Sequence, residues 1–144
     1  MELPARPYDI GKKYGIKIFQ NPMFNILLVA LGGACGAAMR YVIGLLPIKE
    51  PFEFPVKTFA VNILGCFFIG LIVALALKPN CQSQSLTLFL KTGICGGFTT
   101  FSSFALESVD LIKSGNTFIA LIYIALSVVL GICAVWFAEW IIQK

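Results

Sequence analysis

Residues 93–104 read GICGGFTTFSSF and lie inside a long apolar run of the chain. The stretch holds three glycines, two threonines, two serines and three phenylalanines. Glycine weakens a helix, and hydroxyl side chains can hydrogen-bond to backbone carbonyls that have lost their helical partners. We therefore expect a helix break near residues 95–99; the alternative is a kinked helix with a close glycine contact. Non-helical backbone at membrane depth persists only where protein buries it or where it lines a cavity.

The rest of the sequence has the composition of an integral membrane protein. Of the 144 residues, 58% are hydrophobic and only 12% are charged, which is about half the charged share of a soluble domain. Apolar runs cover residues 24–46, 55–77, 86–112 and 117–142. Each run can supply the roughly 20 residues of a spanning helix, and all are too long and too continuous for barrel strands. The sequence predicts an all-α membrane protein with four transmembrane helices, the third broken near its middle.

The predicted transmembrane domain comprises residues 23–144 and follows an N-terminal extension, residues 1–22. The extension is predicted to be either an interfacial helix or a disordered tail. Four spans place both chain ends on one side, together with Arg6, Lys12, Lys13, Lys17, Lys78, Lys91 and Lys144. The other side carries Arg40, Lys49, Lys57 and Lys113. Basic residues far from span ends count little toward topology, so one fixed orientation and insertion in both orientations remain open.

Several function classes find no support in the sequence. The chain has no histidine, and we find no nucleophile–base pair, so the sequence does not predict an enzyme. The net charge of +4 comes from scattered lysines and arginines and does not indicate a nucleic-acid surface. The cysteines are Cys35, Cys66, Cys81, Cys95 and Cys133. Their odd number and spacing give no disulfide framework, and we interpret them as small packing residues.

Polar residues in the first two apolar runs each have two interpretations, because a polar group in a span needs a partner or water. Gly32 and Gly36 form a small-xxx-small face that lets another helix approach closely. Arg40 either extends to the interface or lines an aqueous vestibule and attracts anions. Asn62 either joins helices through its amide or presents its N–H donors to an anion.

Aromatic and polar residues follow the glycine-rich stretch. Phe101 and Phe104 are spaced i, i+3 and so share one helix face. Such a pair is usually core, but the edge of a phenyl ring is positive and tolerates a small anion. Glu107 either accepts hydrogen bonds from hydroxyls or reaches water. Tyr123 and Ser127, spaced i, i+4, form either a polar stripe or ordinary interhelical hydrogen bonds.

Taken together, these residues resemble the Fluc (CrcB) fluoride-channel family. The resemblance rests on GGACGAAMRY at 32–41, TFAVNILG at 58–65, GICGGFTTFSSF at 93–104 and the Tyr123/Ser127 pair. It covers roughly residues 24–142, and the motif at 93–104 is the most specific part. The resemblance implies a multi-pass protein of the bacterial inner or plasma membrane that lets cytoplasmic fluoride leave passively. It also implies an antiparallel, dual-topology homodimer with two pores along the subunit interface. The expected partners are the fluoride ion, membrane lipid and a second copy of the chain.

The resemblance further implies roles for individual residues. The pore and fluoride path would be lined by Thr58, Asn62, Phe101, Phe104, Glu107, Tyr123 and Ser127. Arg40 and Lys57 would lie at a vestibule. The backbone carbonyls of Gly96 and Thr99 would hold one structural sodium ion (Na⁺) at the dimer centre. A conductive fluoride path must replace the ion's tightly held water with donors and positive ring edges.

Three positions depart from the family pattern, of which Ser103 in place of threonine is the mildest, and two other functions stay open. Lys57 stands where the family usually has glycine, and Gly131 stands where some members have serine. A small multidrug antiporter would need a carboxylate within the membrane, for which Glu107 is the only candidate. A non-transporting scaffold subunit would explain the small-residue faces but would leave Asn62, the break and the phenylalanine pair without a role.

Overall fold

The computed structural model describes residues 22–49, 53–78 and 83–144. The predicted N-terminal extension lies outside these residues, apart from Pro22, which begins the first described helix. In chain order the elements are α2 (Pro22–Gly44), α3 (Val56–Ala76), α4 (Gln84–Thr87), η2 (Leu88–Cys95), α5 (Gly96–Phe98), α6 (Phe101–Lys113) and α7 (Thr117–Gln143). No strand occurs in the described part of the chain, and the all-α prediction is confirmed.

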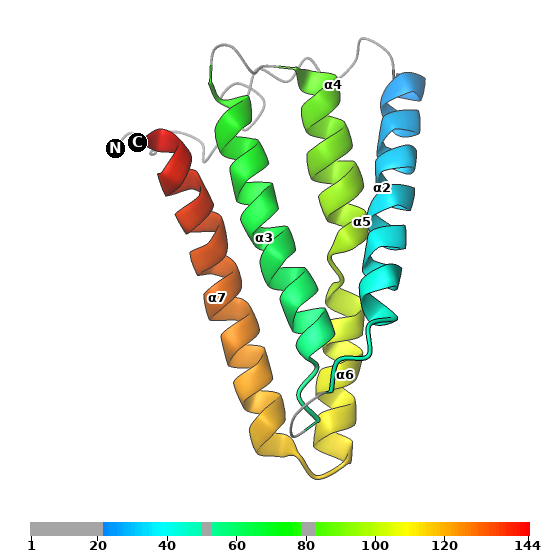
Figure 1. Cartoon of the computed structure of the whole chain (residues 1–144), viewed down its shortest axis with the longest axis vertical. Helices are drawn as coiled ribbons and strands as arrows, with labels where there is room; N and C mark the ends of the chain where they lie inside the picture. The colour runs from blue at the N-terminus through cyan, green and yellow to red at the C-terminus, as the bar shows by residue number, and fades with distance from the viewer. Residues whose placement is uncertain (1–21, 50–52, 79–82) are drawn as a thin grey trace, which may run out of the picture.

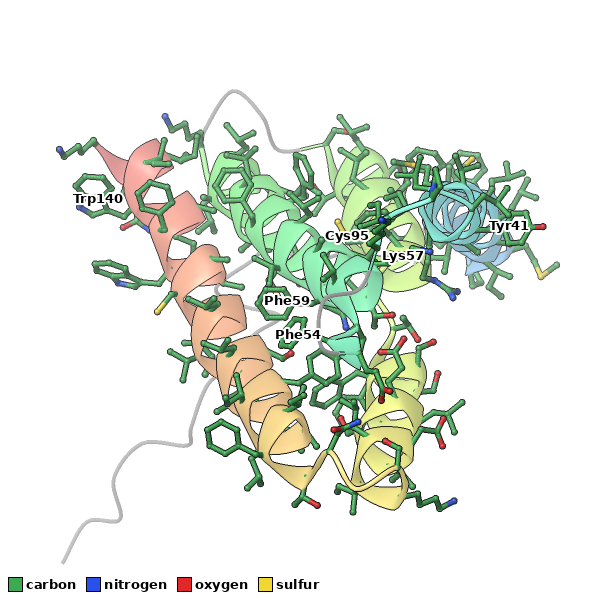
Figure 2. All side chains as sticks on the ribbon, turned by 60° about the horizontal axis from the view of Figure 1, so that its bottom comes forward. Tyr41, Phe54, Lys57, Phe59, Cys95 and Trp140 are labelled. Atoms are coloured by element: carbon green, nitrogen blue, oxygen red, sulfur yellow. The ribbon has the colours of Figure 1, made fainter. Side chains whose placement is uncertain are left out.

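Three helices, α2, α3 and α7, are each long and apolar enough to cross a membrane. Their bounds lie within two residues of those predicted from the apolar runs. Most side chains on their outer faces are exposed and apolar, as expected for surfaces that face lipid. Figure 2 shows Tyr41 on the outer side of α2 and Trp140 pointing away from the helices near the end of α7.

The third apolar run forms a broken helix composed of α4, η2, α5 and α6. The η2 portion is a π-helix, in which hydrogen bonds run from i to i+5. At Thr99 (φ −76°, ψ 155°) and Thr100 (φ −148°, ψ 110°) the backbone is extended. The predicted break is confirmed; it lies at the C-terminal edge of the expected interval, residues 95–99, and includes Thr100. The π-helical segment before it was not predicted.

The break is also where the broken helix changes its packing partners (Figure 1). Before the break, η2 and α5 pack against α2. After it, α6 packs against α7, which in turn packs along α3. The start of α2, the end of α3, α4 and the end of α7 all lie at one end of the molecule (Figure 1). The helices therefore alternate in direction, as the predicted topology requires.

Glycines bring α2 and the broken helix into backbone contact. Gly32 and Gly36 are buried on α2. A Cβ on Gly32 would lie 2.6 Å from the Phe89 carbonyl oxygen and 2.9 Å from the Gly93 Cα, and a Cβ on Gly36 would collide with the Ile94 carbonyl. The predicted small-xxx-small face is thus confirmed, and its partner is the segment just before the break.

The best-buried apolar cluster lies on the other side of the break. Leu111, Ala120 and Tyr123 are almost fully buried, with Phe54, Phe59, Phe104 and Ile119 packed around them. In Figure 2, Phe54 and Phe59 lie in the space between α3, α6 and α7. The cluster therefore fixes α6 relative to α3 and α7, and with it the residues that follow the break.

Candidate functional site

The side-chain amide of Asn62 holds the backbone of the break at Thr100. The Thr100 N–H donates to Asn62 Oδ1 at 2.8 Å, and Asn62 Nδ2 donates to the Thr100 carbonyl at 3.2 Å. Both groups lost their helical partners at the break, so the amide replaces them. The interpretation of Asn62 as an interhelical contact is confirmed. One N–H of its side-chain NH2 group remains outside this pair of bonds.

Most of the other backbone groups around the break are also assigned to partners. The Cys95 carbonyl accepts from the Thr99 N–H at 3.0 Å and from Thr99 Oγ1 at 2.9 Å. Arg40 Nε donates to the Gly97 carbonyl at 3.3 Å. Within the described residues, no hydrogen bond across the break reaches the carbonyls of Gly96 and Thr99. Gly96 is exposed, with open space where a Cβ would be.

Thr100 also begins α6 and so sets the position of the phenylalanine pair. Its Oγ1 accepts a hydrogen bond from the Ser103 N–H at 3.2 Å, a typical N-cap, and donates to Ser103 Oγ at 3.0 Å. Phe101 and Phe104 lie on one face of α6, with ring centroids 5.6 Å apart. The Phe101 ring is 80% exposed, whereas Phe104 is half-buried and lies 5.1 Å from the Tyr123 ring centroid.

Glu107 is the centre of a hydrogen-bond network that joins three helices. Thr58 Oγ1 on α3 donates to Glu107 Oε1 at 2.5 Å, and the Tyr123 hydroxyl on α7 donates to Glu107 Oε2 at 2.8 Å. The interpretation of Glu107 as an acceptor from hydroxyls is confirmed. Ser127, one turn further along α7, is half-buried and lies outside this network among the described residues.

The two predicted vestibule cations both hydrogen-bond to backbone carbonyls. Lys57 Nζ donates to the Gly44 carbonyl, the last of α2, at 3.2 Å, and Figure 2 shows it on α3 near that end of α2. A cation at a helix C-terminus also interacts favourably with the helix dipole. Arg40 lies one turn before Gly44. The two cations therefore both lie near the last turn of α2.

Sequence reasoning missed two kinds of residue at this site. Phe54 and Phe59 form edge contacts, with centroid separations of 5.4 Å to each other and 5.3 Å between Phe54 and Tyr123. Gly65 is buried where a Cβ would collide with the Thr99 side chain. The only sequence signal for Phe59 and Gly65 was their position beside Thr58 and Asn62 in the second apolar run, and Phe54 lies just before that run.

The family described as CrcB-like protein, Camphor Resistance (CrcB) matches residues 27–139. The chain belongs to this family. The CrcB-like match includes every residue of the site above and leaves residues 1–26 outside.

Curated relatives of this CrcB-like chain include proteins named fluoride-specific ion channel FluC. The one from Azobacteroides pseudotrichonymphae is 46% identical over 112 residues, covering 77% of this chain and 90% of the relative. The one from Hyphomonas neptunium is 44% identical over 124 residues, covering 85% and 98%. The one from Agrobacterium fabrum is 47% identical over 116 residues, covering 79% and 92%.

Proposed function

We propose that this protein is a fluoride-selective channel that lets cytoplasmic fluoride leave the cell passively. The observation that carries the proposal is the match to fluoride-specific ion channels along nearly their whole length. The site is chemically suited to the task. It places an amide donor, hydroxyl groups and two phenyl rings beside a break in a helix that packs among apolar helices. These are the groups that can replace the water of a small anion.

The working unit that we propose is an antiparallel homodimer of four-span subunits, with the broken helix as one span. The proposal is supported by the exposure of the backbone around the break in a single chain. Non-helical backbone at membrane depth must be covered by protein or line a cavity. Gly96 is exposed, however, and Thr99 and Thr100 are only half-buried. A second copy against this face would cover the break and bring two sets of phenylalanines together along two pores.

In this proposal fluoride passes Asn62 and the edges of Phe101 and Phe104. The remaining N–H of the Asn62 amide is a donor for the ion, and positive ring edges surround it without binding it too tightly to leave. The Thr58 and Tyr123 hydroxyls currently donate to Glu107. Fluoride moving along this side exchanges for those hydrogen bonds one at a time, with Ser127 continuing the polar path.

A structural sodium ion fits the carbonyl groups at the break. Sodium is a hard cation that takes oxygen ligands, and carbonyls of unwound membrane helices are typical ligands for it. The carbonyls of Gly96 and Thr99 are the two that we assign, and two copies of the chain would supply four. When bound, the ion offsets the partial negative charge of these carbonyls. Arg40 and Lys57 supply positive charge at the vestibule, where it attracts anions.

The test is fluoride release from liposomes that contain the purified protein. Liposomes loaded with potassium fluoride receive a potassium ionophore, and an electrode records fluoride in the outer solution. Protein-free liposomes and liposomes loaded with potassium chloride are the controls. We expect rapid fluoride release with no chloride release. Intact protein that releases no fluoride would exclude the channel and favour a scaffold subunit, with drug–proton exchange as the next assay.

A further inference from the structure

Arg40 contacts the break directly. It is half-buried near the end of α2, and its Nε donates to the Gly97 carbonyl 57 residues further along the chain. That carbonyl belongs to α5, the last helical segment before the break. A guanidinium bonded to a backbone carbonyl also interacts favourably with the negative end of the helix that stops there.

The contact depends on the close approach of two backbones. A Cβ on Gly97 would collide with the Gly33 carbonyl and lie 2.9 Å from the Gly33 Cα. One turn along α2, a Cβ on Gly36 would lie 2.8 Å from the Phe98 backbone nitrogen. Glycine at these positions lets α2 pass so near to α5 that a side chain one turn further, at Arg40, reaches the Gly97 carbonyl.

The hydrogen bonds to the other carbonyls around the break indicate what the bond from Arg40 does. Thr99 donates a hydrogen bond to the Cys95 carbonyl, Arg40 donates to the Gly97 carbonyl, and Asn62 donates to the Thr100 carbonyl. The two carbonyls that the sodium site would use, those of Gly96 and Thr99, lie between these three along the chain. Gly97 is helical, so its φ and ψ hold the two adjoining peptide planes in a fixed relation. Holding the Gly97 carbonyl in place therefore also orients the preceding peptide, which carries the Gly96 carbonyl.

We propose that Arg40 is a positioning residue that holds the Gly97 carbonyl and so presents the Gly96 and Thr99 carbonyls to sodium. This inference rests on the sodium site of the proposed function. It assigns Arg40 a role through its Nε donor, whereas a vestibule residue acts through its positive charge alone.

Three substitutions separate the donor from the charge. In Arg40→Gln the amide nitrogen Nε2 stands the same number of bonds from the backbone as arginine Nε, so a donor stays while the charge is lost. Arg40→Lys keeps the charge but places a methylene at that position. Arg40→Met has similar length and keeps neither group. Lys78→Gln removes an exposed cation far from the break and is the control for charge loss.

The first measurement is hydrogen–deuterium exchange of the intact protein in sodium-free, fluoride-free buffer, over the peptides that contain residues 98–102. We expect about tenfold faster exchange in Arg40→Met and Arg40→Lys, because a hydrogen bond from a charged donor is lost. Arg40→Gln should stay within about threefold of wild type because a neutral donor remains. Lys78→Gln should match wild type.

The second measurement is the rise in thermal midpoint when sodium replaces N-methylglucamine. Wild type, Arg40→Gln and Lys78→Gln should share one rise, and Arg40→Met and Arg40→Lys should show half of it or less. Equal behaviour of Arg40→Gln and Arg40→Met would overturn the proposal, as would wild-type exchange in Arg40→Lys. If Arg40→Met does not fold, Arg40→Lys carries the same comparison.

Failure of the proposed function gives a different pattern. One outcome is that wild type releases no fluoride while the Arg40 variants still differ as expected in exchange rate and in the sodium-dependent rise of the thermal midpoint. That outcome would refute the channel and leave the positioning role of Arg40 intact. No sodium effect in wild type would refute the presentation of carbonyls to sodium. In that case exchange alone would decide whether Arg40 holds the break.

Discussion

The two hydroxyl donors on Glu107 explain how a carboxylate can be accommodated within an apolar bundle. A half-buried carboxylate without partners is costly, whereas hydrogen bonds to a charged group each contribute about 1.5–3 kcal/mol. Thr58 lies on α3 and Tyr123 lies on α7. Each bond therefore satisfies the carboxylate and at the same time fixes α6, the helix that carries the phenylalanine pair, relative to α3 or α7.

We expect Tyr123→Phe to lower the free energy of unfolding by about 1–3 kcal/mol, because one donor to Glu107 is lost while the ring contacts stay. Tyr41→Phe is the matched control, since Tyr41 is 68% exposed on the outer face of α2. It should change stability by less than about 0.5 kcal/mol. Denaturant unfolding in detergent measures both, and equal effects would contradict the role assigned to the Tyr123 hydroxyl.

The high exposure of Phe101 in one chain distinguishes its role from packing. We expect Phe101→Ile to leave the thermal midpoint of the protein nearly unchanged, because the 80% exposed ring makes few contacts. Fluoride release should fall about tenfold, since a branched aliphatic side chain has no positive edge for the ion.

Phe118→Ile is the control for Phe101→Ile. Phe118 is similarly exposed, at 75%, but lies on α7, away from the break. The liposome assay with both variants, at matched protein density, makes the comparison. Wild-type release from Phe101→Ile would remove this ring from the proposed pore.

At the scale of helices, composition predicted where the helices lie in the sequence but not how they pack. Apolar runs gave α2, α3 and α7 to within two residues because a spanning helix needs a nearly fixed number of apolar residues. The break was predictable because glycines and hydroxyls gather between residues 93 and 100. The π-helix η2 was not, because Gly93 in its sequence, LFLKTGIC, weakens an α-helix but does not indicate π-helical hydrogen bonds.

The site was predicted as a set of residues but not as a set of contacts. The motifs selected Asn62 and Tyr123, and Glu107 was selected because it follows the phenylalanine pair. The structure brings Glu107 and Tyr123 into one hydrogen-bond network. Nothing in the amino-acid sequence indicates that Asn62 hydrogen-bonds to the Thr100 backbone or that Arg40 hydrogen-bonds to the Gly97 carbonyl. Such pairings depend on which helices pack together, and that depends on tertiary contacts between glycines far apart in sequence.

Two glycines on α2, three residues apart, offer a test of that packing. Gly36→Ala should destabilise the protein by about 1–3 kcal/mol, because the added methyl would collide with the Ile94 carbonyl and push α2 from the broken helix. Gly33→Ala meets nothing within 4 Å. It should be neutral or stabilise by up to about 1 kcal/mol, because alanine favours the helix. The denaturation midpoint measures both, and loss of stability in Gly33→Ala alone would contradict the described interface.

At the scale of the whole molecule, the surface does not reveal where a second copy would bind. Exposed apolar side chains cover α2 and α7 almost continuously, and lipid and protein partners both accept such surfaces. What distinguishes one face is exposed Gly96, just before the break, together with half-buried Thr99 and Thr100, because lipid cannot satisfy backbone groups left without partners. The sequence alone could not predict this face, because the exposure of the backbone around the break depends on how the helices pack.

Orientation in the membrane gives the last prediction. Near the span ends of the described residues, Lys78 and Lys144 lie on one side and Lys49, Lys57 and Lys113 on the other, so the basic residues give no strong preference. An antiparallel dimer needs both orientations in about equal number. We therefore expect a protease-cleavable tag placed after Lys144 to be cut in about half of the molecules when intact spheroplasts are exposed to protease.

Adding detergent should raise cleavage of the tag to completion, which controls for tags that are folded or inaccessible. A second chain with three arginines inserted before the tag should shift toward one orientation and should lose fluoride release, because antiparallel partners become scarce. Co-expression with a chain biased the opposite way should restore release. Cleavage of nearly all or nearly no wild-type tags on intact spheroplasts would refute dual insertion. Full release from the arginine variant expressed alone would show that antiparallel pairing is not required for conduction.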